Sequence, residues 1–160
     1  MRIVVIAVGR LKRGPERELA ERYRKRFDDI ARRLGFSRLH VQEISESRAR
    51  EALARIAEEG SAISAAIPQD CVLVTLDERG ESIDSQALAF RLSRWRDQSI
   101  SSAVFVIGGA DGLSPELAGK EKLKLAFGAA TWPHQMVRVM LLEQLYRAAT
   151  ILLGHPYHRA

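Results

Sequence analysis

Ala103-Val104-Phe105-Val106-Ile107-Gly108-Gly109-Ala110-Asp111-Gly112 is the stretch of sequence that decides the fold. Its first half is an unbroken apolar run rich in β-branched side chains, which predicts a strand buried on both faces. Its second half is rich in glycine, so the backbone there can turn sharply or approach a ligand closely. A tight turn without a ligand requires the same residues, and both interpretations stay open at this point.

Similar apolar runs occur at residues 3–8, 39–44, 71–76 and 124–127, and each predicts a strand. Asp77-Glu78-Arg79-Gly80 follows the third of these runs and is typical of the turn that closes a strand. Amphipathic or capped segments lie between the strands and predict helices. The expected helix starts are Pro15, Ser47, Asp84 or Ser85, Ser114 and His134. The stripe expected to be buried in the second helix is Leu53, Ile56, Ile63 and Ile67.

Strands and helices alternate along the whole chain, which is typical of an α/β fold: a three-layer domain with a mostly parallel sheet. The chain has 160 residues and shows no repeat, linker or low-complexity segment, so we expect a single domain over residues 1–160.

The distribution of charge and the single cysteine limit the classes of function that this chain can have. Residues 1–40 hold twelve Lys and Arg against five Asp and Glu, which favours a polyanionic partner such as a nucleic acid or, alternatively, one solvated basic helix face. Cys71 is the one cysteine, so no internal disulfide can form, and a structural zinc site is not expected. No apolar run approaches the roughly 18 residues of a membrane helix. We therefore expect a cytoplasmic protein without a metal or a membrane anchor.

Ligands of open parallel sheets bind beyond the carboxyl ends of the strands. Three segments qualify here: Leu76-Asp77, residues 108–112 and residues 127–133. The spacing of the glycines differs from the dinucleotide-binding pattern, and the chain contains neither a P-loop nor a G-x-S-x-G nucleophile motif. The sequence thus predicts a ligand at this edge of the sheet but excludes these common site types.

The last helix and the tail behind it carry two further signals. The helix is apolar around nearly its whole circumference, which predicts burial on more than one side and, in a chain this short, a homodimer. The tail His155-Pro156-Tyr157-His158-Arg159-Ala160 combines general acid–base groups with a guanidinium suited to phosphate. A disordered polar tail is the alternative interpretation.

These motifs together resemble the ribosomal large subunit methyltransferase H family of the SPOUT superfamily. The resemblance rests on residues 105–113, Thr131-Trp132-Pro133-His134-Gln135-Met136-Val137-Arg138, Glu143-Gln144-Leu145-Tyr146-Arg147-Ala148 and the tail, in this order. Residues 5–12 and Val74-Thr75-Leu76-Asp77 match as well, so the resemblance spans the chain.

The resemblance implies a fold with a C-terminal trefoil knot, a homodimer, and transfer of a methyl group from S-adenosylmethionine to N3 of a pseudouridine (the 1915 site) of 23S rRNA on the assembled ribosome. The implied cofactor residues are Leu76, Gly108, Phe127, Gly128, Ala129, Ala130, Thr131 and Trp132. Gly128-Ala129 departs from the serine-containing loop that is more usual in the family.

The implied catalytic residues lie in the tail, which is thought to meet the cofactor pocket across the dimer. His158 is the candidate base, Tyr157 would stack on or hydrogen-bond the target base, and Arg159 would hold a phosphate. A tail that only straps the dimer partner is the alternative. Two other functions stay open: a SPOUT enzyme that methylates a ribose 2′-OH or another base, and a non-enzymatic RNA-binding ribosome factor.

Overall fold

The computed structural model describes residues 1–158 and contains one five-stranded sheet in the order β2-β1-β4-β3-β5, with every pair of neighbouring strands parallel. The strands are β1 (Arg2–Val8), β2 (His40–Ile44), β3 (Cys71–Ser82), β4 (Ser102–Ile107) and β5 (Leu123–Ala126). The helices are α1 (Pro15–Ala31), a short 3-10 turn (Arg32–Leu34), α2 (Ala52–Ala66), α3 (Ser85–Asp97) and α4 (His134–Leu152). The predicted three-layer α/β fold with a parallel sheet is confirmed.

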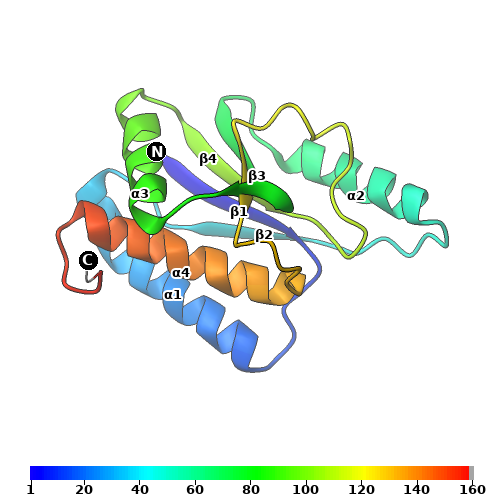
Figure 1. The fold of residues 1–160 in the computed structure, drawn as a ribbon, viewed down its shortest axis with the longest axis horizontal. Coiled ribbons are helices and arrows are strands. Elements are labelled where there is room, and N and C mark those ends of the chain that lie inside the picture. The colour runs from blue at the N-terminus through cyan, green and yellow to red at the C-terminus, as the bar shows by residue number, and fades with distance from the viewer. Residues whose placement is uncertain (159–160) are drawn as a thin grey trace.

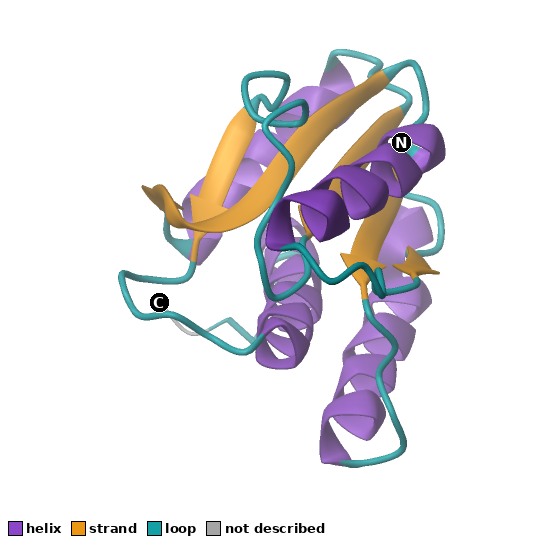
Figure 2. Cartoon of the chain, turned by 90° about the vertical axis from the view of Figure 1, so that its right-hand side faces the viewer, coloured by secondary structure: helices purple, strands orange, loops and turns teal. Residues whose placement is uncertain are grey.

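Helices cover both faces of the sheet, with α1, α3 and α4 on one face and α2 on the other (Figures 1 and 2). Alternate residues of the strands supply the two cores. Ile3, Val5 and Phe105 pack with the three-helix layer, whereas Ile6, Val104 and Val106 pack with Ile63 of α2 and Leu117. The central strands are therefore apolar on both faces, as the unbroken run at residues 103–107 predicts.

Two local predictions were wrong. Residues 114–120 form turns instead of a helix, because Leu117 is drawn into the α2-side core and Gly119 takes a left-handed φ of 92° only five residues after the expected start. β3 runs past Gly80 to Ser82, because Glu81 and Ser82 pair with β5 beyond a register shift. Tertiary pairing thus overrides the local turn and cap signals.

The predicted start of α2 was also wrong, and so was the first residue of its predicted buried stripe, Leu53. Ser47 does not cap the helix, which begins at Ala52 after Glu51; its hydroxyl instead bonds the Glu58 side chain and the Ala49 N–H. Leu53 is 81% exposed, although Ile63 of the same stripe is buried. Only the second half of α2 packs against the sheet, since the first half extends past its edge (Figure 1).

The apolar surface of α4 is largely buried against other elements of the same chain. α4 packs between α1 and α3 and against the sheet, and it buries Leu141, Leu142 and Leu145. One buried polar residue of α4 is Arg138, which is 2% exposed and donates to Glu43 Oε1 of β2 at 2.6 Å and to the Gly9 carbonyl at 2.7 Å. The apolar pattern of α4 therefore does not by itself require a second molecule, and the homodimer stays a prediction, as does the knot.

Candidate functional site

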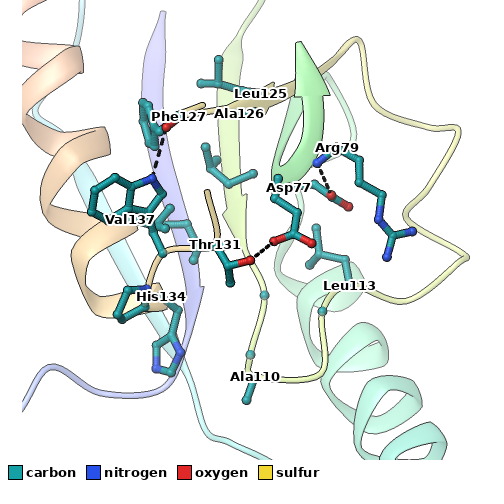
Figure 3. Close-up of a pocket in the computed structure, with 18 of the residues that line it drawn as sticks. Asp77, Arg79, Ala110, Leu113, Leu125, Ala126, Phe127, Thr131, His134 and Val137 are labelled. Carbon is teal, nitrogen blue, oxygen red and sulfur yellow. Dashed lines mark hydrogen bonds between the residues drawn. The ribbon is translucent and has the colours of Figure 1, made fainter. Parts of the chain in front are cut away.

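A cavity lies beyond the carboxyl ends of β4 and β5 and beside the middle of β3, where the sequence predicted a ligand. Its volume is about 720 Å³, within the range of small-molecule and cofactor sites. The walls come from residues 76–79 of β3, from the glycine loop (residues 108–112), from residues 125–133 and from the start of α4. Asp77, Leu113 and Thr131 reach the cavity from three separate segments (Figure 3).

Seven of the eight predicted cofactor residues line this cavity: Leu76, Gly108, Phe127, Gly128, Ala130, Thr131 and Trp132. Ala129 is exposed and is not among the lining residues. The parallel sheet explains why segments more than 30 residues apart meet here, since the carboxyl ends of neighbouring strands share one edge.

Two side-chain contacts fix the loop that follows β5. Thr131 donates its hydroxyl hydrogen to Glu78 Oε2 just past the first half of β3, and Trp132 donates from Nε1 to the Phe127 carbonyl at 3.2 Å. Both contacts are drawn in Figure 3. Trp132 remains 44% exposed, so an aromatic surface stands beside the opening of the cavity. This loop is thus held at both ends while its backbone faces the cavity.

Among the described residues, most of the charged side chains that line the cavity are acidic. Asp77, Glu78 and Asp111 line the cavity together with the basic Arg79 and, at the start of α4, His134. Arg55 of α2 binds Asp111 through two hydrogen bonds, from Nε at 2.6 Å and from Nη2 at 3.0 Å, and holds the pKa of that carboxyl below its usual value. Asp111 therefore stays ionised at neutral pH with its charge balanced by Arg55, and Asp77 and Glu78 are the lining carboxylates that suit a ligand with positive charge.

The tail lies at the other end of α4 from the cavity. His134 and Val137 at the start of α4 line the cavity, whereas Tyr157 and His158 follow the end of the helix. Nineteen helical residues span about 27 Å. Figure 1 shows the start of α4 beside the cavity-forming loops and the segment that follows α4 at the opposite end of the helix. A single chain consequently does not bring the predicted catalytic and cofactor residues together.

Within its own chain the tail folds back on α4. Tyr157 donates its hydroxyl hydrogen to Glu143 Oε1 at 3.1 Å, its ring centroid lies 4.7 Å from that of Tyr146, and the Arg147 guanidinium lies 4.8 Å from the Tyr157 centroid. Both ring nitrogens of His158 are buried without a hydrogen-bond partner among the described residues. Arg159, the third predicted catalytic residue, lies outside the described residues.

Burial is the main reason why the pKa of the Tyr157 phenol is raised. Desolvation, followed by the neighbouring Tyr23 hydroxyl and Glu143 carboxylate, raises the pKa of Tyr157 well above its ordinary value of 10.0. Burial also raises the pKa of the Cys71 thiol, which lies at the amino end of β3, away from the cavity. A protonated thiol is a poor nucleophile, and this one lies at the end of β3 away from the cavity.

Sequence reasoning missed part of the site. Gly109 and Asp111 belong to the glycine-rich stretch after β4, but the sequence analysis assigned neither of them a role. Nothing in the sequence linked them to Arg55 or Glu59, about 50 residues earlier. The glycine pattern and the acidic Asp111 were the available signal. The partners could not be found, because helix periodicity does not say which strand loop a helix will contact.

Among residues 1–158, no helix has the length and apolar character to cross a bilayer. The same residues contain no group of three or more His, Cys, Asp or Glu side chains that could hold a metal ion.

Comparison with known proteins identifies relatives over the whole chain. The family model described as predicted SPOUT methyltransferase matches residues 1–158. A protein of Rhodopseudomonas palustris (strain BisB18) named ribosomal RNA large subunit methyltransferase H is 72% identical over 160 residues, which is 100% of both chains. A protein of Nitrobacter hamburgensis with the same name is 69% identical over 159 residues, which is 99% of both chains.

One solved structure is similar in fold. A probable methylase family protein from Haemophilus influenzae Rd KW20 superposes with a TM-score of 0.53 at 14% sequence identity, over 99% of this chain and 70% of that one. At this identity the likeness concerns the fold alone.

Proposed function

Because the chain belongs to the SPOUT methyltransferase family, we propose that it methylates N3 of a pseudouridine, the 1915 site, in the 23S rRNA of the assembled ribosome. The coarser activity, methylation of large-subunit rRNA with S-adenosylmethionine as cofactor, follows from the family and from relatives at 68–72% identity. The observation that carries the proposal is the cavity of about 720 Å³ that seven of the implied cofactor residues line.

The residues of this cavity fit S-adenosylmethionine. Leu76, Leu125 and Phe127 offer apolar surface for an adenine, and the backbone of residues 126–132 offers amide groups for its edge. Asp77 and Glu78 complement the positive charge of the amino group and the sulfonium. Of the two residues that depart from the usual serine-containing loop, Ala129 does not line the cavity and Gly128 does; we expect the departure to leave affinity intact if the adenine is bound by backbone groups and to lower it if hydroxyls are needed.

Bound S-adenosylmethionine supplies the electrophilic methyl group, and the chain supplies position and proton transfer. The imide N3 of pseudouridine carries a proton at neutral pH and must lose it before it can attack. His158 is the proposed base, or the group that orients the base, because an imidazole titrates near neutrality. Tyr157 would stack on the target base, and Arg159 would hold a phosphate.

A homodimer would unite the two halves of this site. The cavity and the tail lie at opposite ends of α4, so two copies related by a two-fold axis with antiparallel α4 helices would place each tail near the other copy's cavity. Partly exposed residues are available on α4 for such a contact, including Met136, Met140 and Gln144. His158, whose nitrogens are unpartnered when folded back, would find its partners there.

The basic N-terminal region is the proposed rRNA contact. Arg10, Lys12 and Arg13 are exposed in the loop after β1, at the same sheet edge as the cavity. Arg22, Lys25 and Arg26 are exposed on α1. Such contacts would bind phosphates without reading the sequence and would weaken with salt. Ribosomes reside in the cytoplasm of bacteria, which is where we expect the protein to act.

The deciding experiment is methyl transfer from labelled S-adenosylmethionine to ribosomes that lack this modification, with the product nucleoside identified by mass spectrometry. N3-methylpseudouridine in 23S rRNA is the expected product. A methylated ribose or another base would select a different SPOUT activity. Absence of both transfer and cofactor binding would select the non-enzymatic ribosome factor and overturn the proposal.

A further inference from the structure

Helix α2 contacts the glycine loop from outside the cavity. Arg55 binds Asp111 of that loop with two hydrogen bonds and also donates from Nη1 to the carbonyls of Ala49 (3.1 Å) and Arg50 (2.7 Å). One guanidinium therefore joins the start of α2, the segment before it and the loop that lines the cavity. The bidentate geometry fixes direction as well as distance.

Glu59, one turn further along α2, is a buried carboxylate whose hydrogen bonding is incomplete. It is 6% exposed, and its Oε1 accepts the Ser47 N–H at 2.9 Å, but its Oε2 has no partner among the described residues. An unsatisfied buried charge costs free energy, so a donor is expected in some functional state. The Gly109 backbone is the glycine-loop segment next to Oε2.

Two glycines permit this close packing. A Cβ on Gly109 would lie 2.7 Å from Glu59 Oε2, and a Cβ on Gly60 of α2 would lie 2.4 Å from the Cβ of Ser114. Both distances are below 3.0 Å, closer than real Cβ atoms approach a non-bonded atom, so a neighbouring group would have to move. The helix and the loop thus approach as closely as backbone allows, over a face that continues to Ile63 and Leu117 in the same apolar cluster.

We propose that Arg55 and Glu59 are positioning residues for the cofactor: they hold the glycine loop in its binding conformation, and Glu59 Oε2 accepts a backbone N–H of that loop when S-adenosylmethionine is bound. Neither side chain lines the cavity, so both act through the loop. The inference rests on the proposed cofactor site, because it assigns the loop to that site.

Glu59→Gln is the sharpest test, because it preserves size and the acceptor for Ser47 but replaces the second oxygen by an amide. We expect the dissociation constant for S-adenosylmethionine, measured by calorimetry, to rise about tenfold while the thermal unfolding midpoint stays near that of the wild type. In a methyl-transfer assay with ribosomes as substrate, KM for S-adenosylmethionine should rise, and kcat at saturating cofactor should stay at the wild-type value. Wild-type affinity in this variant would overturn the role of Glu59.

Gly109→Ala tests the contact from the loop side. Its added methyl group should lower cofactor affinity by displacing the loop from Glu59, and the double variant Gly109→Ala with Glu59→Ala should recover part of that loss because the obstructing carboxylate is gone. Strictly additive losses would mean that the two positions do not communicate.

Charge reversal tests the ion pair. Arg55→Asp should weaken cofactor binding about tenfold, and Arg55→Asp combined with Asp111→Arg should restore much of it. Arg91→Ala is the matched control, since it breaks the Arg91–Glu81 pair of 2.7 Å between residues that do not line the cavity. An equal effect of the control, or no rescue by the reversed pair, would overturn the role of Arg55.

Ala130→Trp separates this inference from the proposed site. Ala130 lines the cavity, and an indole there should fill it and abolish cofactor binding. If this variant binds S-adenosylmethionine like the wild type, the site itself is misplaced. If Ala130→Trp fails to bind and Glu59→Gln binds normally, the site stands and the positioning role falls.

Discussion

Tyr157 and Glu143 are joined by a hydrogen bond of 3.1 Å, with the tail phenol as donor and the α4 carboxylate as acceptor. Glu143 also accepts from Nε and Nη2 of Arg147, at 2.9 and 2.6 Å, and the Arg147 guanidinium lies over the Tyr157 ring. The tail is therefore attached to its own helix at a defined point, Glu143, which lies roughly 14 Å along α4 from His134 in the cavity wall.

Tyr157→Phe tests the protonation of this phenol. At neutral pH we expect the variant to lose about 1 kcal/mol of unfolding free energy, the usual net value of one hydrogen bond. The folded state raises the pKa of Tyr157, so its contribution is complete below the unfolded-state pKa near 10 and is lost as the pH rises above that value. Urea unfolding from pH 7 to 11 should show wild-type stability falling toward that of the variant. A constant difference over this range would contradict the assignment.

Mixing two inactive variants tests whether the site is shared between copies. His158→Ala removes the proposed base, and Ala130→Trp blocks the cavity of the other chain. Random exchange of subunits would give half heterodimers, each with one intact site, so we expect about a quarter of the wild-type methyl transfer. Each variant alone should be nearly inactive. No recovery after exchange is verified by mass would place tail and cavity in the same chain.

Gly60→Ala separates helix propensity from tertiary contact. In an isolated helix the change would stabilise by about 1 kcal/mol. Here the new Cβ would lie 2.4 Å from the Ser114 Cβ, so we expect a loss of about 1–3 kcal/mol in chemical denaturation. Ser114→Gly in the same chain should relieve the clash and recover most of the loss. A stabilised single variant would show that the segment carrying Ser114 can move away freely.

Glu43→Ala tests the buried charge of Arg138. The guanidinium is 2% exposed and pairs with Glu43 Oε1 at 2.6 Å, so removing the carboxylate leaves an uncompensated buried charge. We expect a loss of about 3 kcal/mol, measured by urea unfolding. Glu46→Ala is the control, because Glu46 is exposed and should change stability by no more than about 0.5 kcal/mol.

A double variant distinguishes the contribution of charge from that of packing in the Glu43–Arg138 pair. Glu43→Leu combined with Arg138→Met removes both charges and should lie close to wild-type stability. If the double variant is as unstable as Glu43→Ala, the side chains stabilise by packing rather than by pairing.

The sequence alone determined the α/β class, the parallel sheet and the edge of the sheet that carries the cavity. These follow from local chemistry: unbroken apolar runs such as residues 103–107 make buried strands, and the carboxyl ends of parallel strands meet at one edge. Leu76, Gly108 and Thr131 were assigned to one site on the resemblance, and the sheet brings them to one cavity.

The tertiary structure alone decided how far each element extends and what holds the cavity together. β3 continues through Gly80 because β5 pairs with it, and residues 114–120 remain turns because Leu117 is buried under α2. Arg55 and Glu59 reach the glycine loop across some 50 residues of sequence. Periodicity reports which face of an element is buried, but only the packed chain fixes its partner, because such contacts depend on long-range geometry that local propensity does not encode.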